Sequence, residues 1–449
     1  MVSLMLTRFF SDYGMLLVLL LLCALLSAAT IAEQHPSGAA AAEQLAGAII
    51  AQTPAGAHVA IIARDGDDDR AFTATLQTQL TTANRKIVAQ VNGQPHHGAR
   101  ALQDLAGAGV KIDVIAVTKE AGAWAIFDDF AQENPLSKDA QRLRPESYYW
   151  PNFLKASNLV NVADQTAIIA IMAIGMTMVI LAGGIDLSVG SLLALSAVLS
   201  ALLIREVGGG RDASPFVMIV FCVLAIFACA LVGLGTGLLV TWFRVPAFIV
   251  TLGVMLQARG LAEKLTGGES VFGLPDAFTW LGRDSTLGFL PNSVVLMIVL
   301  YAIAHFVMAQ TVLGRYIYAV GGNSEAARLS GVPVRRVIVG VYVVSALLAG
   351  VGGIIIASQL QTGAPTYGSM YELYVIAAVV VGGTSLSGGE GKILGTLIGA
   401  FLIAVIRNGM NLLDLKSWDQ TIVLGSIIIL AVLFDRAKHL GWLRWRSLQ

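Results

Sequence analysis

The stretch "MTMVILAGGIDLSVGSLLAL" at residues 176–195 places two apolar runs on either side of a glycine-rich turn. Each run is part of a longer apolar segment, and about 20 mainly apolar residues are enough for a helix to cross a bilayer. Asp186 lies between the runs, and a charge at membrane depth usually faces a partner, a cavity or an interface. Asp186 is therefore a candidate residue of a path through the membrane. The alternative is that it caps the helix that follows.

The overall composition agrees with a membrane protein. The chain has 449 residues, of which 56% are hydrophobic and 13% charged, against about 25% charged in an average globular domain. A soluble globular enzyme, a disordered chain and a collagen-like fibre are excluded. The 29 acidic side chains balance the 29 Lys and Arg, so no basic field for nucleic acid exists. Residues 33–146, with 14 acidic and 10 basic side chains, have an ordinary water-soluble composition.

The apolar runs predict an all-α polytopic membrane protein with about ten transmembrane helices and a small α/β insert after the first. The glycine-rich sequence "GGTSLSGGEG" interrupts the eighth run, where a short or broken helix is the alternative. The expected domains are the first helix at 1–34, the insert at 35–146 and a transmembrane core at 147–449. The ten runs are 14–32, 165–183, 187–205, 215–240, 246–265, 291–311, 338–358, 372–388, 394–412 and 419–435.

Lys and Arg in the short loops predict the orientation. The C-terminal segment and the 312–337 loop are the most basic, which places both of them and the N-terminus in the cytoplasm and the insert outside. Arg205, Arg211 and Arg283 oppose this orientation. A cleaved signal peptide is an alternative for the first run, because "LLSAAT" offers small residues. Removing it would leave the orientation of the other nine spans unchanged.

The soluble insert alternates strand and helix patterns. Strands are predicted at 57–63, 86–92 and 110–117, and helices at 68–84, 96–108 and 121–132. This alternation indicates a small parallel α/β sheet, and we expect residues 40–140 to fold independently. The composition weakly resembles one lobe of the sugar-binding proteins that feed bacterial importers. Ligand binding, docking and structural spacing remain alternative roles for the insert.

Metal binding is not expected in this chain. Asp65, Asp67 and Asp69 alternate like the ligands of a calcium loop, but Arg70 stands where that loop needs Gly, and Leu76 where it needs Glu. The acidic residues are better explained as the start of a helix. The three cysteines all lie in apolar runs and form no ligand cluster.

Four further polar residues are weaker candidates for the translocation path. By the span count, Arg259 and Glu372 lie near the outer ends of spans five and eight, where interfacial snorkelling is the alternative. Asn408 and Asn411 are three residues apart and share one helix face. Hydrogen bonding between helices explains these two asparagines equally well.

Several longer segments together resemble the permease subunits of bacterial ATP-binding-cassette (ABC) sugar importers, in the ribose/xylose/galactose branch. The similarity covers about residues 150–435 and implies a ten-helix permease that works as a dimer in the cytoplasmic membrane. It also implies two ATPase subunits, which bind ATP, and an extracytoplasmic sugar-binding protein, with no cofactor in this chain. The alternatives are an ion-coupled secondary carrier and a membrane receptor that senses ligand through the α/β insert. The segments are "GMTMVILAGGIDLSVGS", "VPAFIVTLG", "GRYIYAVGGNSEAARLSGV", "AAVVVGGTSLSGGEGKILGTLIGA" and "NGMNLL".

The cytoplasmic loop 312–337 has helical propensity from Glu325 to Leu329, and Gly331 is expected to end that helix. The same resemblance assigns a docking role to this loop. Residues 325–331 match the EAA-x3-G segment that inserts into the ATPase subunit, which carries the role to Glu325, Ala326, Ala327 and Gly331. The fragment "LSGGE" resembles an ATPase signature. No phosphate-binding loop of the form G-x4-G-K-[ST] accompanies it, so this chain is expected to bind no nucleotide and to catalyse no reaction.

The chain departs from the family pattern at two places. About 110 extra residues follow the first span, where members pass quickly to the segment "NFLKASNLVNVADQTA" (152–167). The insert therefore stands where the binding protein would dock. Arg407 replaces an uncharged residue before "NGMNLL", and we expect it either at the outer mouth or paired with an acidic residue.

Overall fold

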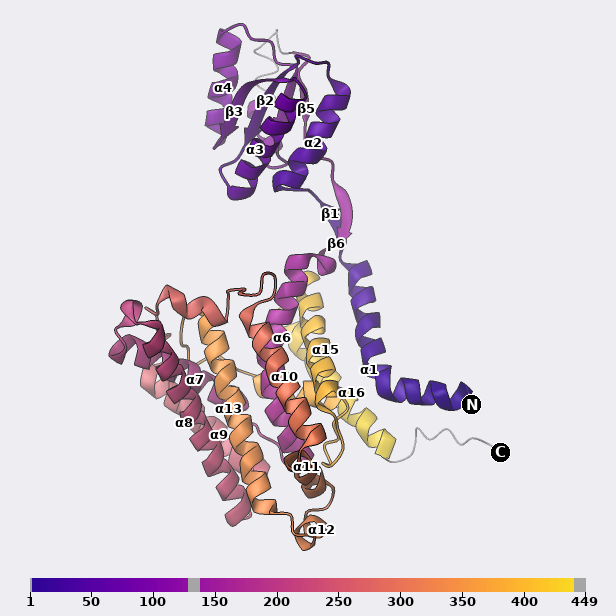
Figure 1. Ribbon diagram of the computed structural model, residues 1–449, viewed down its shortest axis with the longest axis vertical. Helices are drawn as coiled ribbons and strands as arrows, with labels where there is room; N and C mark the ends of the chain where they lie inside the picture. Colours follow the sequence, from indigo (N-terminus) through magenta and orange to yellow (C-terminus); the bar gives the residue numbers. More distant parts are fainter. Residues whose placement is uncertain (1, 128–137, 440–449) are drawn as a thin grey trace. The chain divides into compact units, whose positions relative to one another are not determined.

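The computed structural model describes residues 2–127 and 138–439. The chain divides into two compact units. One is helical and consists of the residues up to Thr30 together with those from Asn152 onward, and the other consists of residues Ile31–Pro151. Figure 1 shows the elements of both units with their labels.

The helical unit has a helix at every one of the ten predicted apolar runs (Figure 1). Six of the described helices, α6, α7 with its extension to Val207, α8, α10, α13 and α15, are long and apolar enough to cross a membrane. The chain is thus polytopic, and the count of ten spans stays a prediction. The helices at the runs are α1 (Val2–Ala29), α6 (Ala156–Leu181), α7 (Val189–Leu202), α8 (Pro215–Trp242), α9 (Ala247–Thr266), α10 (Asn292–Gln310), α13 (Val334–Leu360), α14 (Tyr371–Val381), α15 (Ile393–Leu412) and α16 (Ser417–His439).

Shorter elements connect these helices. Two α-helices lie between α10 and α13, namely α11 (Val312–Gly322) and α12 (Ser324–Leu329). A π-helical turn extends α7, and three 3-10 turns lie in the loops. These are η4 (Leu203–Val207), η3 (Asn152–Leu154), η5 (Gly210–Asp212) and η6 (Asp276–Leu281).

Helix α13 is the centre of the bundle and packs against α6, α7 and α8. Glycines make these contacts close. A Cβ atom on Gly233 of α8 would lie 2.5 Å from the carbonyl oxygen of Tyr342, and one on Gly237 2.7 Å from the Cα of Val339. On α6, a Cβ on Gly175 would lie 2.6 Å from the Cα of Ser345. Small residues of this kind let helix backbones approach where no water competes for the contact.

Two of the helices are short because glycine-rich turns break them. Helix α7 begins at Val189, and α14 ends at Val381, so the helix expected over 372–388 has only 11 residues. The two turns meet, since the main-chain N–H of Gly389 donates to the carbonyl of Leu181 over 2.9 Å. Broken helices are tolerated at membrane depth where protein covers them or where they line a cavity. In these turns Asp186 and Thr384 are buried, whereas Gly183 and Gly383 are exposed.

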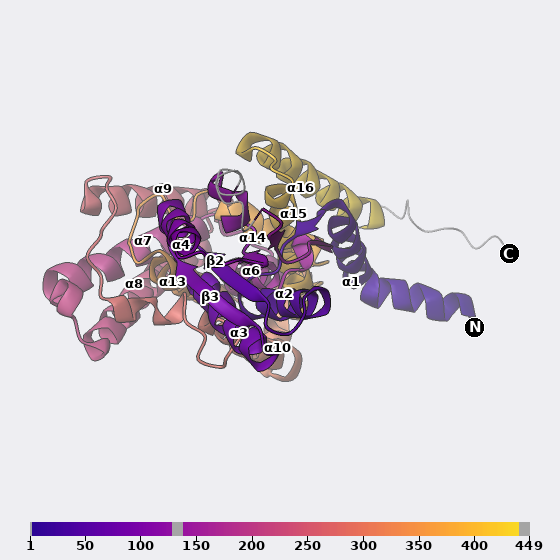
Figure 2. The ribbon, with the colours of Figure 1, turned by 90° about the horizontal axis from the view of Figure 1, so that it is seen from above.

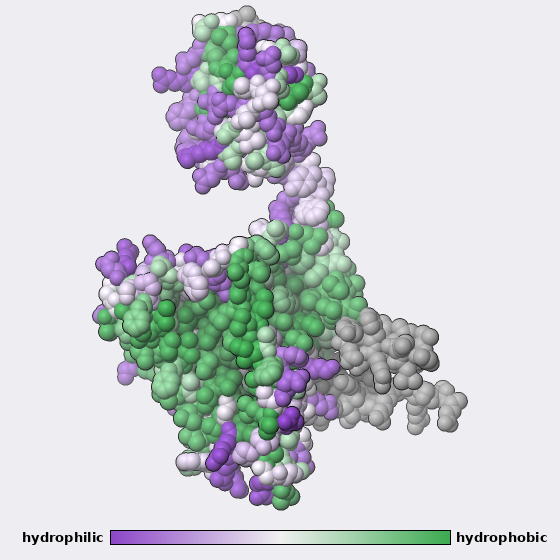
Figure 3. Space-filling model, viewed as in Figure 1, coloured by the Kyte–Doolittle hydropathy of each residue, from purple (hydrophilic) through white to green (hydrophobic). Residues whose placement is uncertain are grey.

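The outer surface of the helical unit is strongly apolar. The face drawn in Figure 3 is mostly green over its helices, whereas the surface of the α/β unit is a mixture of polar and apolar residues. The exposed apolar residues of α8 include Phe216, Ile219, Val223, Phe227 and Leu231. A continuous apolar surface of this extent is typical of a lipid-facing bundle.

The unit of residues 31–151 contains a four-stranded parallel sheet in the order β3-β2-β4-β5. The strands predicted at 57–63 and 86–92 are present, and the third begins at Val114 rather than residue 110. The strands are β2 (His58–Ala63), β3 (Lys86–Asn92), β4 (Val114–Val117) and β5 (Gln141–Leu143), and the helices are α2 (Gly38–Gln52), α3 (Asp67–Thr82), α4 (Pro95–Gly107) and the 3-10 turn η1 (Ala121–Ala123).

Two hydrophobic cores fill the space on the two faces of this sheet. Helices α2 and α3 cover one face through residues such as Ile49 and Phe72. Helix α4 and the segment from η1 to Phe127 cover the other, where Leu102 is buried. Figure 2 shows α4 and α2 on opposite sides of strand β2. The helix expected over 121–132 begins as the 3-10 turn η1, and its residues 128–132 lie outside the described part of the chain.

A separate antiparallel ribbon closes the α/β unit. Strand β1 (Ile31–Gln34) pairs with β6 (Tyr148–Pro151), with Ile31 opposite Pro151 and Gln34 opposite Tyr148. Directly beyond the ribbon, the N–H of Asn152 donates to the carbonyl of Thr30 over 2.8 Å. The chain therefore leaves and re-enters the helical unit at one place.

Replacing Gly233 with Val tests the packing of α8 on α13. We expect the variant to lower the free energy of unfolding by about 1–3 kcal/mol, because the added atoms meet the backbone of Tyr342. Gly235→Val is the matched control on the same helix, since a Cβ at Gly235 meets nothing within 4 Å. Thermal unfolding of both variants in detergent measures the difference. Equal midpoints would show that close approach at Gly233 contributes nothing to stability.

Candidate functional site

The turn that precedes α7 carries Asp186, the most buried acidic side chain among the described residues of the helical unit. Asp186 is 1% exposed. One carboxylate oxygen accepts from the main-chain N–H of Ser188 over 3.0 Å and from its hydroxyl over 2.6 Å. The other accepts from the hydroxyl of Ser345 on α13 over 2.8 Å. These three bonds fasten the turn before α7 to the central helix of the bundle.

The depth of Asp186 differs from the sequence-based expectation. The span count placed this turn near the cytoplasmic surface. Its partner Ser345 instead lies eleven residues beyond Val334, the first residue of α13, which is about 16 Å along the helix. The N-cap of α7 is Ser188 rather than Asp186, so simple capping by Asp186 is not what the structure shows.

Glu372 reaches the same turn of α7 from the other end of the sequence. A Cβ on Gly190 would lie 2.5 Å from its carboxylate oxygen Oε2, so the half-buried side chain lies directly against this glycine. Asp186 precedes α7 and Glu372 lies against its first turn, so the fold brings both acidic residues to the same end of α7. The loop before α14 folds back onto that helix and places Glu372 there.

Arg259 holds the loop that precedes α14, the helix whose first turn contains Glu372. Its guanidinium Nη1 donates to the carbonyl of Tyr367 over 2.8 Å and also to that of Pro365. The side chain is half-buried on α9, in contact with this loop. Arg259 thus positions the segment between α13 and α14, and three of the five path candidates gather around the α7 turn.

The two asparagine candidates join helices instead. The amides of Asn408 on α15 and Asn158 on α6 exchange two hydrogen bonds, of 2.8 and 3.1 Å. Asn411 is exposed and accepts from Gln420 of α16 over 2.8 Å. The spacing of three residues does place both on one side of α15. Their observed role is helix-to-helix hydrogen bonding.

The structure also shows a polar cluster that sequence inspection did not single out. Asp164 of α6 accepts from Gln359 of α13 over 2.8 Å and from the hydroxyl of Ser293 at the start of α10. The sequence signal that could have identified Asp164 is an acidic residue directly before the apolar run of span two. Arg407, the unusual cation of α15, lies over the ring of Tyr374, with 4.6 Å from Cζ to the ring centre. This is a cation–π contact rather than the pair with an acidic residue that was one of its two expected placements.

Residues 325–331, within the 312–337 segment, form a small, mostly exposed turn of helix that is called the hook below. The side chain of Asn323 accepts from the N–H groups of Glu325 and Ala326, over 3.1 and 3.0 Å, and so caps α12. Gly331 ends this turn with φ of +84°, a conformation that favours glycine. The predicted helical segment from Glu325 to Leu329 and its glycine stop are therefore present.

The outward face of α12 is available to a partner. Glu325 and Arg328 form an exposed ion pair of 2.6 Å along the helix, and Leu329 is 82% exposed. Ala327 is buried and packs the helix onto the bundle. A large apolar side chain beside an exposed charged pair, on a helix fixed at both ends, is a suitable docking surface.

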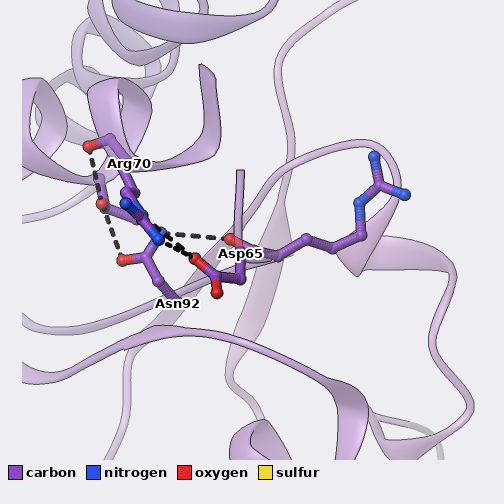
Figure 4. Close-up of polar contacts among 5 residues, drawn as sticks. Asp65, Arg70 and Asn92 are labelled. Atoms are coloured by element: carbon purple, nitrogen blue, oxygen red, sulfur yellow. Dashed lines mark hydrogen bonds and ion pairs between the residues drawn. The ribbon is translucent and has the colours of Figure 1, made fainter. Parts of the chain in front are cut away.

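The polar residues at the carboxyl ends of the α/β strands are bonded to one another (Figure 4). Asp65 accepts two bonds from Arg70, of 2.7 and 3.1 Å. Thr73 donates to Asn92 over 3.0 Å. Asp67 and its two acidic neighbours lie in the first turn of α3. The guanidinium of Arg70 satisfies the first carboxylate of the calcium-like pattern, in agreement with the rejection of a calcium loop.

Comparison with known proteins identifies the family of the helical unit. The pattern of the family described as "Branched-chain amino acid transport system / permease component" matches residues 158–432. The chain belongs to this permease family. Its members are transport components rather than enzymes, and the bundle of apolar helices agrees with that assignment.

Individual relatives place the chain among sugar permeases. The ribose import permease protein RbsC of Escherichia coli strain K12 is 45% identical over 293 residues, covering 64% of this chain and 88% of the relative. RbsC of Bacillus subtilis strain 168 is 44% identical, covering 64% and 87%. The xylose transport system permease protein XylH of E. coli strain K12 is 34% identical, covering 64% and 86%. No solved structure matches the chain.

Replacing both Asn158 and Asn408 with Leu distinguishes a structural pair from a path residue. Asn158→Leu leaves the buried amide of Asn408 without its partner, which costs about 1–3 kcal/mol, and we expect the double variant to recover most of that loss. Asn408→Leu leaves the half-buried Asn158 its bond to the carbonyl of Phe153, so we expect a smaller loss of stability. We expect the double variant to keep its transport rate. Loss of transport from a stable double variant would instead place Asn408 in the translocation path.

Proposed function

We propose that this chain is the permease subunit of an ATP-driven importer that carries a monosaccharide across the bacterial cytoplasmic membrane. Family membership over residues 158–432 is the observation that carries the proposal. Relatives that are 34–45% identical are named for ribose and xylose, so pentoses are the first substrates to test. The chain supplies the path, and ATP is hydrolysed by a separate partner.

The ATPase partner docks on α12 in this proposal. Glu325, Ala326 and Gly331 are exposed, and Ala327 holds the helix on the bundle. The exposed hook is joined through α11 and the start of α13 to the core helices, with which α11 and α12 are in contact. Movement of the ATPases would therefore be transmitted to α13, against which α6, α7 and α8 pack.

The translocation path runs beside the first turn of α7. Asp186, Glu372 and the loop held by Arg259 gather there, and a polyhydroxylated sugar needs polar groups of this kind along its route. Asn408 and Asn411 hold α6 and α16 next to α15. A second copy of the chain, proposed as the partner of a homodimer, would complete the path.

The orientation follows from the basic loops. Both termini and α12 lie in the cytoplasm, and the α/β unit lies outside, where an extracytoplasmic sugar-binding protein delivers the substrate. The α/β unit is outside the residues that match the family. It has its own cores, and we propose docking or spacing as its role.

Uptake of labelled monosaccharides tests the function. Cells would express the chain with its ATPase and binding protein, and each component would be omitted in turn. We expect uptake of ribose or xylose to need all three. Uptake that persists without the ATPase would contradict the proposal and indicate a stand-alone carrier. Uptake that persists without the binding protein would assign ligand capture to the α/β unit.

Charge reversal on α12 tests the docking surface. We expect Glu325→Arg to abolish co-purification of the ATPase while the permease remains inserted, and Gly331→Asp to do the same through the strained φ. The double variant Glu325→Arg/Arg328→Glu restores the ion pair within the helix with its sign reversed. Recovery of ATPase binding by this variant would show that the Glu325–Arg328 ion pair stabilises α12 and does not itself contact the ATPase. Unaltered binding by either single variant would refute the docking assignment.

A further inference from the structure

The ribbon of β1 and β6 displays three consecutive aromatic side chains. Tyr148, Tyr149 and Trp150 are 50%, 75% and 46% exposed. Successive side chains of a strand point to opposite faces, so Tyr149 lies on one face and its two neighbours on the other. Ile31, which is 55% exposed, shares the face of Tyr149 through the pairing register. Both faces of the ribbon therefore present apolar and aromatic surface.

A two-stranded ribbon with bare faces needs a further partner, since an isolated hairpin is marginally stable in water. Its aromatic side chains combine an apolar ring with a hydroxyl or indole N–H. Such side chains are best accommodated where one part of the surroundings is apolar and the other wet. The lipid headgroup layer of a membrane supplies both, and Trp and Tyr are enriched there.

The chain places the ribbon at the ends of membrane helices. Strand β1 begins two residues after Ala29, the last residue of α1, and Pro151 is followed directly by Asn152. The N–H of Phe153 donates to the hydroxyl of Thr30 over 3.1 Å, so the two chain segments are fastened together at this point. The side chains of Leu21 and Leu25 on α1 are about 60% exposed and present an apolar surface suited to lipid.

The ribbon is long enough to cross the lipid headgroup layer. A bilayer is about 40–45 Å thick with its headgroups and about 30 Å without them, which leaves roughly 5–8 Å on each side. Four residues of strand extend about 13 Å. A ribbon that begins where these helices leave the hydrocarbon and runs outward crosses the headgroups. Glu33 and His35 on β1 and just beyond it oppose deeper entry into hydrocarbon.

We propose that the β1–β6 ribbon is an interfacial anchor whose side chains Tyr148, Tyr149 and Trp150 lie among the lipid headgroups. Headgroups contact both faces of the ribbon. These contacts restrict rotation of the α/β unit about the two strands that link it to the helices. Only the assignment to the outer leaflet rests on the proposed function. Contact with headgroups follows from the membrane helices and the ribbon alone.

Spin labels on the full-length protein in lipid nanodiscs test this anchor. The background has Cys23, Cys222 and Cys229 replaced with Ala, and the discs contain phosphatidylcholine, phosphatidylglycerol and a lipid with a nickel-chelating headgroup. A single label is placed at Tyr149→Cys or at Glu33→Cys, which lies opposite Tyr149 and leaves all three aromatic side chains intact. Leu21→Cys on α1 and Gln103→Cys, which is exposed on α4, are the controls for hydrocarbon and water.

We expect the headgroup nickel to enhance relaxation of the ribbon labels more than that of either control label. We also expect their collision rates with oxygen to lie between those of the two controls. Ribbon labels that behave like the label at Gln103 would overturn the proposal, because they would lie in water. Labels shielded from both nickel and oxygen would also overturn it and indicate a protein partner. The measurement uses the permease alone, so it is independent of which substrate is imported.

Discussion

Close approach of helix backbones to α13 is the constraint on which the bundle depends. Gly175, Gly233 and Gly237 bring α6 and α8 against it, with no room for a Cβ atom at the contacts. On the other side, a Cβ on Gly353 of α13 itself would lie 2.9 Å from the Cβ of Ser196 on α7. In lipid the hydrophobic effect does not drive apolar helices together. Tight packing and hydrogen bonds between the helices must therefore stabilise the bundle.

The same packing makes the broken helices possible. The turns before α7 and after α14 interrupt the regular helix, and each backbone group left unpaired in hydrocarbon would cost several kcal/mol. Leu181 and Gly389 satisfy one another, and the carboxylate of Asp186 satisfies Ser188 and Ser345. A polar centre is thereby assembled inside an apolar bundle. Its side chains are held by the bundle, which suits a path that must bind a sugar weakly and release it.

Particular residues show which elements sequence patterns can predict. Apolar runs predicted the helices of the bundle, and short runs rich in Val and Ile predicted the ends of β2 and β3 to within one residue. Helix α2 was missed because its alanine-rich sequence lacks a clear amphipathic pattern. The ribbon strands were missed because "IAEQ" and "YYWP" are short and pair across more than 100 residues. The hook at Glu325–Gly331 was predicted because capping and the glycine stop are local.

The sequence by itself determined the membrane class, the positions of the apolar helices, the soluble α/β segment and the permease family, since hydropathy, periodicity and local motifs are properties of contiguous residues. Only the tertiary structure decided which polar side chains meet. Asp186 and Glu372 are separated by most of the bundle in sequence, yet both lie at the N-terminal end of α7. Asn408 and Asn158 hold two helices together. These pairings depend on helix rotation and on the depth of broken helices, which are decided by packing among distant segments and have no local sequence signal.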